Sequence, residues 1–593
     1  MFTIFSYKIT EKQLLIAILL LAAFLRFWVL GSTEFFHDEG FKAFRSIGYL
    51  DYLQNDDQTT PIQWFNPAPF KECEEIFDRY LAEGGNYGNG NSNCSSELFN
   101  KYRSLKGAGF KDGALPSWTS LSFHDHPPLF FLIQNLFFKI FGISLFAARL
   151  PSAIAGVLSV YLIYLISKKT FKNTLMALLP PLLLSVNLLH LWVSRASLME
   201  STQIFFILLN IYYFFQFSED RRRWKSFGFT LGLCFLIKYT SAFLIPVYGI
   251  YLLIFKRDIY RWKEFYFALG LATVIFSPVL IFNFYLWRTV GHFDLQFAYL
   301  FRQPTPEWRA SLGKIQDPFS EIISNLTLTY SIPFILLTLA GIGWAIYEIF
   351  NSYRTNRTYM TYLIFWLLNI IFITLMLVAV GSGFRFIVLY SAPAIMLITF
   401  LADYLLSRFS RKDFLLISVA VFAVYELWFA SDIFRTFPDF GVVKLDNYLN
   451  AELGDKRSLS IPSSSNPHLN KIIKSWALKI PAGDKSQIIV YDGNVGLSPR
   501  LWLFARRNYY LGIPTFNVDQ FKNFLQKGGA EEFRGYDIYF VRAHKGTILN
   551  PLFQNASAEE LEAFLIRQLN LSPLKLIKGY NGSLMFTVYK FKL

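Results

Sequence analysis

The chain has 593 residues, of which 53% are hydrophobic, 19% are aromatic and only 17% are charged. This balance excludes an ordinary soluble enzyme of this length and favours a protein that crosses a membrane several times. The formal net charge is +15, but the Lys and Arg residues fall in short clusters between apolar segments. The charge therefore indicates membrane topology and not a nucleic-acid partner.

The first apolar segment, residues 14–30, follows Lys8 and Lys12 and is long enough to span a bilayer. No small-residue cleavage site follows it, so we interpret it as an uncleaved signal anchor with a cytoplasmic N-terminus. The sequence STEFFHDEGF at 32–41 then lies outside, at the start of a large outer loop over 31–126.

Further apolar segments predict the remaining spans. They lie at roughly 150–166, 175–193, 203–217, 227–237, 242–255, 265–286, 332–349, 362–380, 386–405 and 414–430. Lys and Arg accumulate in cytoplasmic loops, and such clusters occupy every second connection, near 168–172, 221–225, 256–263, 354–357 and 408–412. The pattern predicts about eleven transmembrane helices, with residues 1–435 as the membrane domain.

The C-terminal region, residues 436–593, lies outside on this topology and is long enough for a domain of its own. Strand candidates begin at Gln487 (QIIVYDG) and Tyr536 (YDIYFVRA), and a helical pattern begins at Ala558 (AEELEAFLIRQL). We predict a small extracytoplasmic α/β domain. Because it stands on the outer side, we hypothesise that it selects a substrate for a reaction at that side.

The chain contains only three cysteines. Cys73 and Cys94 share the first outer loop and are either a disulfide or two free thiols. We slightly favour a disulfide that closes this loop, which would indicate an oxidising compartment such as a periplasm. Cys234 lies in an apolar segment and is interpreted as inert packing.

Ionisable side chains are costly near hydrocarbon, so those kept at the ends of spans are candidate functional residues. On the predicted topology they all fall on the outer side: His37, Asp38 and Glu39; His124, Asp125 and His126; Arg149; Arg195 and Glu200; Lys238; and Arg385. Such carboxylates, imidazoles and cations suit a reaction between an anionic, lipid-borne group and a hydroxyl.

Structural roles compete with this interpretation. Arg149 and Lys238 stand at membrane boundaries, where basic residues snorkel and act as anchors. Asp38 and Glu39 could cap the following helix through its dipole. Two adjacent carboxylates at the lipid interface are expensive for a cap alone, so the functional interpretation is favoured for that pair.

A metal site is a further alternative in the first outer loop. His124, Asp125 and His126 have ligand chemistry, but no fourth ligand is identified, so the case for zinc is weak. No cofactor is certain, and a divalent metal stays possible. Pro127 and Pro128 fix the chain that enters the next apolar helix.

Three stretches carry a family resemblance: FFHDEGF at 35–41, HDHPPLFFLIQNLFFKIFGISLFAARLPSAIAGVLSVYLIYLISKK at 124–169, and LGLCFLIKYTSAFLIP at 231–246. They resemble the bacterial branch of the dolichyl-phosphate-mannose protein mannosyltransferase family, within the type C membrane glycosyltransferases, to which the lipid A aminoarabinose transferases are related. The likeness covers roughly residues 10–405. It implies a polytopic helical fold in a bacterial inner membrane, a polyprenyl-phosphate-linked sugar as donor and transfer at the outer, periplasmic face.

The resemblance also implies roles for single residues. Asp38 matches the acidic residue assigned as catalytic base, and Glu39 is its neighbour in the motif. Asp125 and His126 stand where the aminoarabinose enzymes have a Glu-Lys pair before proline, with the Lys contacting the donor phosphate; a histidine carries that charge only when protonated. FRFIVLYSAP resembles the Arg-Tyr-x-x-x-x-x-Pro stretch, with Phe386 replacing Tyr, so Arg385 is carried over as a substrate-binding residue.

The chemistry fits these residue types independently. Negative charge builds on the phosphate oxygens as the sugar leaves, and fixed cations stabilise that state; Arg385, Arg195, Lys238 and His126 are the candidates. A carboxylate at Asp38 would take the proton of the acceptor hydroxyl, and direct attack with one base predicts inversion at the anomeric carbon. The acceptor is a hydroxyl of a protein, a glycolipid or a glycan.

Two other classes remain open. A lipid or solute transporter or flippase would place ionisable groups near the bilayer midplane and often shows inverted repeats, neither of which the sequence indicates. A lipid-linked polysaccharide polymerase also uses polyprenyl carriers and large outer loops. The Asp-Glu pair directly after the first span argues against the polymerase.

Overall fold

The computed structural model describes residues 2–4, 7–49, 117–123, 125–290, 293–301, 303, 317–352, 357–408, 412–431, 439–454, 456–461, 474, 477–484, 486–547, 549, 556–579 and 582–593. The chain forms two compact units. The first comprises Met1–Gly31, His124–Gln303 and Leu312–Thr436, and the second comprises Ser32–Phe123, Pro304–Ser311 and Phe437–Leu593. The segment that carries Asp38 and Glu39 therefore groups with the C-terminal region. Cys73 and Cys94 lie outside the described residues.

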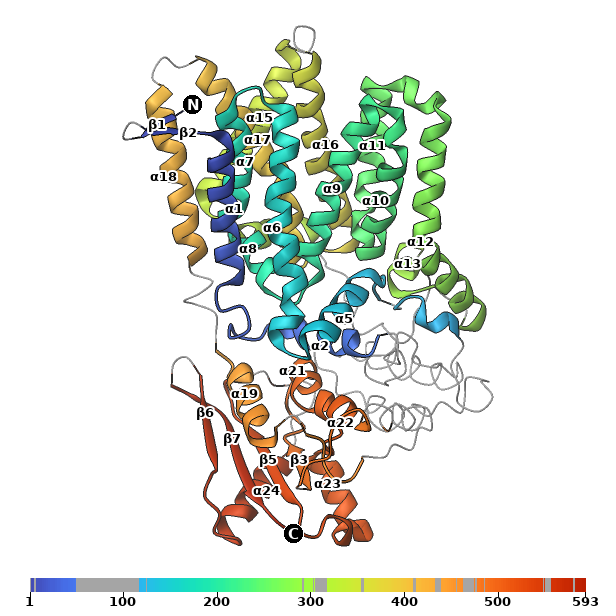
Figure 1. Ribbon diagram of the computed structural model, residues 1–593, viewed down its shortest axis with the longest axis vertical. Helices are drawn as coiled ribbons and strands as arrows, with labels where there is room; N and C mark the ends of the chain where they lie inside the picture. Colours follow the sequence, from blue (N-terminus) through green and yellow to red (C-terminus); the bar gives the residue numbers. More distant parts are fainter. Residues whose placement is uncertain are drawn as a thin grey trace. The chain divides into compact units, whose positions relative to one another are not determined.

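The first unit is a bundle of helices preceded by a short hairpin of β1 (Phe2–Ile4) and β2 (Tyr7–Ile9) (Figure 1). Its α-helices are α1 (Glu11–Phe27), α5 (Leu129–Phe141), α6 (Leu145–Thr170), α7 (Thr174–Val186), α8 (Leu188–Arg195), α9 (Met199–Glu219), α10 (Trp224–Ile237), α11 (Leu244–Phe255), α12 (Lys263–Val290), α13 (Leu295–Leu300), α14 (Pro318–Thr329), α15 (Ile332–Ser352), α16 (Arg357–Val380), α17 (Ser391–Arg408) and α18 (Lys412–Ser431). The 3₁₀ turns among its described residues are η6 (Arg221–Arg223), η7 (Tyr239–Phe243), η8 (Arg257–Arg261) and η10 (Phe384–Tyr390). Each apolar segment expected as a span is largely helical.

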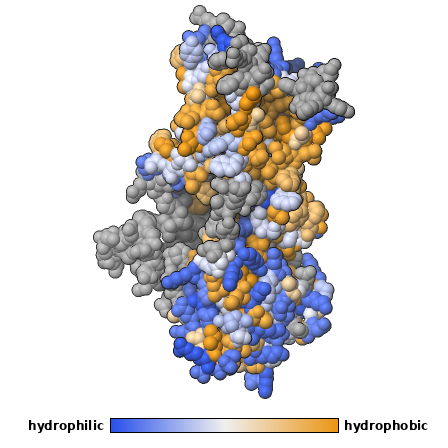
Figure 2. Space-filling model, turned by 90° about the vertical axis from the view of Figure 1, so that its left-hand side faces the viewer, coloured by the Kyte–Doolittle hydropathy of each residue, from blue (hydrophilic) through white to orange (hydrophobic). Residues whose placement is uncertain are grey.

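Several of these helices are long and apolar enough to cross a membrane. Within the described residues there are five: Leu145–Thr170, Lys263–Arg288, Ile332–Asn351, Tyr359–Val380 and Phe384–Arg408. A sixth arises if the bent pair α7 and α8 counts as one span. Large apolar side chains such as Phe350 and Leu328 are exposed on this unit, and Figure 2 shows the resulting orange surface. The predicted helical, integral membrane fold is confirmed, while about eleven spans stays a prediction.

The segment expected as one span over 175–193 is broken at Asn187, where α7 and α8 meet at 55°. The Asn187 side chain accepts a hydrogen bond from His190 N at 3.1 Å and so caps α8. The fully buried Arg26 of α1 donates to the carbonyl oxygens of Leu184 (3.3 Å) and Ser185 (3.1 Å) at the end of α7. The break is thus stabilised from both sides, because it leaves carbonyls that the helix itself does not satisfy.

The second unit contains a five-stranded sheet in the order β4 (Thr515–Asn517), β3 (Gln487–Tyr491), β5 (Asp537–Ala543), β7 (Leu584–Phe591) and β6 (Lys575–Lys578). β3 is parallel to β4 and β5, whereas β7 is antiparallel to β5 and β6. Its helical elements are α2 (His37–Ile47), η5 (Ser117–Ser120), α19 (Val442–Leu453), α21 (Leu497–Arg500), η12 (Leu501–Ala505), α22 (Arg506–Leu511), α23 (Val518–Phe524), η13 (Leu525–Gly529), η14 (Glu531–Phe533) and α24 (Ser557–Arg567). The strands predicted near Gln487 and Tyr536 and the helix near Ala558 are present.

The core of this sheet forms where the parallel strands meet the helices. Ile488, Val490, Ile538 and Phe540 are fully buried, and Leu565 of α24 packs against them. Adjacent strands and a helix thus bury one continuous apolar layer, which is why the short strand signals in the sequence were sufficient to predict them.

Candidate functional site

The Asp38–Glu39 pair begins α2 in the second unit. The Glu39 carboxylate is 1% exposed and accepts a hydrogen bond from the backbone N–H of Phe36 at 2.7 Å. This hydrogen bond caps α2, which is the structural role that the sequence analysis named as the alternative for Asp38 and Glu39. Asp38 is half-buried in the same helical turn. Glu39 therefore has a structural contact that explains its position, and Asp38 is the stronger candidate base.

In the first unit, three predicted residues from distant parts of the chain converge. Glu200 begins α9, Lys238 follows α10, and Arg385 lies in η10. The Glu200 Oε1 atom is 2.6 Å from Lys238 Nζ and 3.1 Å from Arg385 Nε. We call Glu200, Lys238 and Arg385 the cation cluster.

The cation cluster lies against an aromatic ring. Lys238 Nζ is 3.9 Å from the centre of the Phe386 ring, and the Arg385 guanidinium is 5.2 Å from it. Phe386 is the residue that replaces the family's Tyr, so its ring supplies a cation–π surface in place of a hydroxyl. The side chains of Lys238 and Glu200 are only 9% and 3% exposed, so their attraction is weakly screened by water.

Hydrogen bonds fix the segment that carries Lys238. Gln203 of α9 donates to the hydroxyl oxygens of Thr240 (2.8 Å) and Ser241 (3.1 Å), directly after the lysine. Gln203 lies three residues after Glu200, on the same face of α9. The helix that supplies the carboxylate therefore also holds the 3₁₀ turn that follows the ammonium group.

Asp125 and His126 form a second pair, with 2.9 Å between Asp125 Oδ2 and His126 Nδ1. This contact orients the imidazole ring. His124 and the His37 side chain lie outside the described residues. Among the residues that the structure describes, no group of three or more His, Cys, Asp or Glu side chains is arranged to hold a metal ion. A divalent metal therefore stays open.

The two remaining arginines contact the end of α1. Arg195 Nη1 donates to the carbonyl oxygens of Leu25 (2.8 Å) and Arg26 (3.2 Å), and Arg149 Nη1 donates to Leu30 O at 2.9 Å. Arg195 satisfies carbonyls that α1 leaves open at its C-terminus, and Arg149 contacts the turn after α1. These contacts hold the end of the first helix and the turn that follows it. Cys234 is buried and donates its thiol to Phe206 O at 3.1 Å, as expected of a packed cysteine.

Asp294 is a buried carboxylate that the sequence reasoning missed. It accepts hydrogen bonds from Tyr239 OH (2.7 Å), Asn283 Nδ2 (2.9 Å) and Phe297 N (2.9 Å). Tyr239 directly follows Lys238 in the chain. The hydrogen bond from Tyr239 to Asp294 therefore links the segment after α12 to the segment that carries Lys238. The available signal was an Asp placed directly before the helical sequence LQFAYL, which is an N-cap position.

Asp294 should make stability depend on pH. Burial raises its pKa to about 6, from an ordinary 3.8. Between pH of about 4 and about 6 the native state keeps a proton that the unfolded chain has lost, so the free energy of unfolding falls as pH rises, by up to about 3 kcal/mol. Asp294→Asn should remove this part of the slope in unfolding curves recorded at several pH values.

The exposed Asp317, which caps α14, provides the control. Asp317→Asn should keep the wild-type slope, because Asn also caps helices. Identical slopes for wild type and Asp294→Asn would contradict the expectation.

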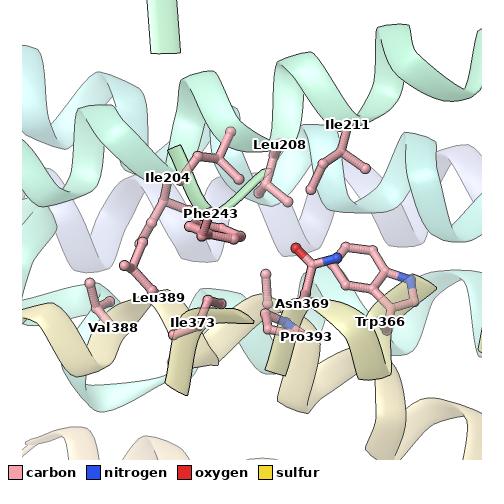
Figure 3. Close-up of a pocket in the computed structure, with 12 residues that line it drawn as sticks. Ile204, Leu208, Ile211, Phe243, Trp366, Asn369, Ile373, Val388, Leu389 and Pro393 are labelled. Atoms are coloured by element: carbon pink, nitrogen blue, oxygen red, sulfur yellow. The ribbon is translucent and has the colours of Figure 1, made fainter. Parts of the chain in front are cut away.

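A small cavity of about 20 Å³ lies inside the first unit (Figure 3). Its lining includes Ile204 and Leu208 of α9, Phe243 of η7, Trp366 of α16 and Leu389 of η10. α9 and η10 also supply two members of the cation cluster. The cavity has room for about one water molecule and none for a lipid chain, so the helices here form a closely packed support.

Parts of this chain are similar to known proteins. Residues 125–282 match the family model described as dolichyl-phosphate-mannose-protein mannosyltransferase. An uncharacterized protein of Aquifex aeolicus is 40% identical over 119 residues, which are 19% of this chain and 26% of that protein. The putative mannosyltransferase YycA of Bacillus subtilis is 35% identical over 85 residues, or 14% of this chain and 12% of YycA. The aligned part is thus a small share of each relative.

Among solved structures, ArnT from Cupriavidus metallidurans bound to undecaprenyl phosphate is similar to this chain, with a TM-score of 0.49, 13% identity and 97% of each chain covered. The segment matched by the family model contains Asp125, His126, Glu200 and Lys238. Residues 125–282 are therefore similar to the dolichyl-phosphate-mannose-protein mannosyltransferase family, which is the family that the motifs of this chain resemble.

Proposed function

We propose that this protein is an inverting glycosyltransferase that moves a sugar from a polyprenyl-phosphate donor to a hydroxyl acceptor at the outer face of a membrane. The observation that carries the proposal is the cation cluster, in which Lys238 and Arg385 meet at Glu200. Two of its three members lie in the family segment, and the family's name specifies a lipid-phosphate-linked sugar as donor.

The cation cluster would act on the departing lipid phosphate. As the bond from the anomeric carbon to the phosphate oxygen breaks, the phosphate gains negative charge, and Lys238 and Arg385 stabilise that charge more than they stabilise the intact donor. Glu200 holds both cations in place before the donor arrives, so little reorganisation accompanies the reaction. Asp125 and His126 are a second candidate contact for the donor.

Asp38 would act as general base. It takes the proton from the acceptor hydroxyl as the hydroxyl oxygen attacks the anomeric carbon, and a single displacement inverts that carbon. In this assignment Glu39 caps the helix that bears the base, and Arg195 supports the end of α1 instead of binding phosphate. The proposal needs no cofactor and leaves a divalent metal open.

The proposed topology has about eleven spans, with a cytoplasmic N-terminus and the loop at 31–126 on the outer side. Residues 436–593 then form an outer domain, on the periplasmic side of a bacterial inner membrane. The alternating Lys and Arg clusters support this orientation.

The bent pair α7 and α8 is a feature that transporters also use, because broken helices carry their binding sites. Here Arg26 of α1 hydrogen-bonds the last carbonyls of α7 at the break. A polyprenyl-carrier transporter is therefore the alternative to test in the same preparation.

The test uses the purified full-length chain in lipid nanodiscs. We expect release or transfer of sugar from at least one polyprenyl-phosphate-linked sugar and none from the matching nucleotide sugars. Turnover of a nucleotide sugar would refute the lipid-donor proposal. Movement of the intact lipid-linked sugar across a vesicle bilayer without any bond cleavage would establish the transporter instead.

A further inference from the structure

We propose that the C-terminal sheet positions the general base, because helix α2, which carries Asp38, is docked on the loop that follows strand β3. This inference rests on the proposed function, in which Asp38 is the base. It makes the C-terminal region part of the catalytic apparatus and not only a selector of acceptors.

The docking contact joins Gly40 and Phe41 of α2 to Ser498 of α21. The backbone N–H of Phe41 donates to Ser498 Oγ at 3.1 Å. A Cβ atom on Gly40 would stand 2.2 Å from Ser498 O and 2.6 Å from the Phe35 ring. Only glycine permits this approach between the two helices. Gly40 lies two residues after Asp38, so the contact is made within the same helical turn as the base.

The loop that receives α2 occupies a special place in the sheet. β3 has parallel neighbours on both sides, β4 and β5, and the chain leaves β3 toward β4 before it returns to β5. The carboxyl end of β3 is therefore a topological switch point, where open α/β sheets receive their ligands. Ser498 belongs to the segment that starts at this end, and here the bound element is α2 of the same chain (Figure 1).

The receiving loop is firmly held. Asp492, directly after β3, is fully buried, forms an ion pair with Arg542 of β5 and accepts a hydrogen bond from Ala543 N at 3.3 Å. Asn494 N also donates to Asp492 Oδ1 at 2.9 Å. The loop is thus anchored to the neighbouring strand, and α2 packs against a rigid support.

Two further groups of contacts fix α2 along its length. Phe44, only 1% exposed, lies against Tyr509 and Tyr510 of α22, with ring centres 6.0 and 5.4 Å away. On the segment around η5, Tyr49 OH donates to Ser120 O at 3.1 Å, and the Arg45 guanidinium stacks 5.2 Å from the centre of the Phe123 ring. α2 is therefore held by α22 and by the η5 segment in addition to Ser498.

Gly40 and Ser498 are therefore positioning residues. A misplacement of about 1 Å in a reacting group can cost roughly 10²-fold in rate. We expect Gly40→Ala to lower kcat by about 10²-fold and to leave the KM for the lipid donor unchanged, because the donor's phosphate is assigned to Lys238 and Arg385.

The experiment measures two quantities on the full-length protein: hydrogen–deuterium exchange over residues 37–47 and steady-state turnover of the lipid-linked sugar. The variants are Gly40→Ala, Ser498→Ala and Ser498→Thr. Gly343→Ala in α15 is the control, because a Cβ there meets no atom within 4 Å. Gly40→Ala and Ser498→Ala should speed exchange in α2, and Ser498→Ala should lower kcat roughly tenfold through its lost hydrogen bond. Ser498→Thr keeps the hydroxyl and should restore both readouts.

The two readouts separate the possible failures. Unchanged exchange in α2 of both Gly40→Ala and Ser498→Ala overturns the docking contact, whatever the activity. Faster exchange with unchanged kcat overturns the positioning role. A wild type that turns over no donor refutes the proposed function, and the exchange data then still decide whether the sheet holds α2.

Discussion

Asp38→Asn should lower kcat by ~10²–10⁴-fold without unfolding the protein, because an amide cannot accept the proton of the acceptor hydroxyl. The side chain keeps its size, so the docking of α2 should persist. The loss should appear in kcat and not in the KM for the lipid donor, since the base acts only once the hydroxyl attacks. Single-turnover measurements with a saturating lipid-linked sugar would isolate this step.

Glu39→Gln is the matched control for Asp38→Asn. Gln retains the oxygen that accepts the Phe36 N–H, and Gln serves at this position of a capping box as well as Glu does. We expect activity within a few-fold of wild type. Replacing the carboxylate acceptor of the Phe36 N–H by a neutral amide oxygen should cost about 1 kcal/mol or less of stability. A larger loss in Glu39→Gln than in Asp38→Asn would move the base to Glu39.

Glu200→Ala should be the most destabilising single change in the first unit that we name, at about 3–5 kcal/mol. It removes the carboxylate that Lys238 and Arg385 share and leaves both cations in a site from which water is largely excluded. The measurement is the midpoint of thermal unfolding of the detergent-solubilised protein, together with denaturant unfolding where it is reversible.

An exposed ion pair supplies the comparison. Lys169 and Glu219 are 2.5 Å apart, but the Glu219 side chain is 55% exposed. Glu219→Ala should cost less than about 1 kcal/mol, because water screens and replaces a surface partner. Adding Lys238→Met to a Glu200→Gln variant should recover part of the lost stability, since one unpaired cation is then removed. Equal costs for Glu200→Ala and Glu219→Ala would contradict the buried-cluster interpretation.

Sequence patterns predicted the helical elements well, for a simple physical reason. A membrane helix must satisfy its own backbone hydrogen bonds and present apolar side chains over its whole length, so each span leaves a continuous signal in the chain. The C-terminal strands left a shorter signal, but β3 and β5 are buried along their length and are rich in Ile, Val, Phe and Tyr.

The break at Asn187 was not predictable from hydropathy, because both sides of it are apolar. The two halves differ only in direction, and the partner that satisfies the end of α7 is Arg26, which lies more than 150 residues earlier in the chain. An arginine within the first span carries no sequence signal for its target. Only packing reveals that it binds the carbonyls of another helix.

The candidate site was also predicted only in part from the sequence. Motif and chemistry singled out Asp38, Glu200, Lys238 and Arg385, since ionisable groups are rare and costly next to hydrocarbon. The same reasoning could not separate them from Arg149 and Arg195, which contact the turn after α1 and the end of α1 in the structure. In the amino-acid sequence, a charged residue at a membrane boundary looks the same whether its side chain binds a ligand or the end of a helix.

The sequence by itself determined that this protein is a helical membrane protein, which family its motifs resemble, and which residue types could react. Those properties depend on local composition and on short motifs, so they survive without knowledge of contacts. Only the tertiary structure decided that Glu200 gathers Lys238 and Arg385 and that α2 docks on Ser498. Each of these joins residues through space, and a hydrogen bond or ion pair between distant segments has no counterpart in the order of the chain.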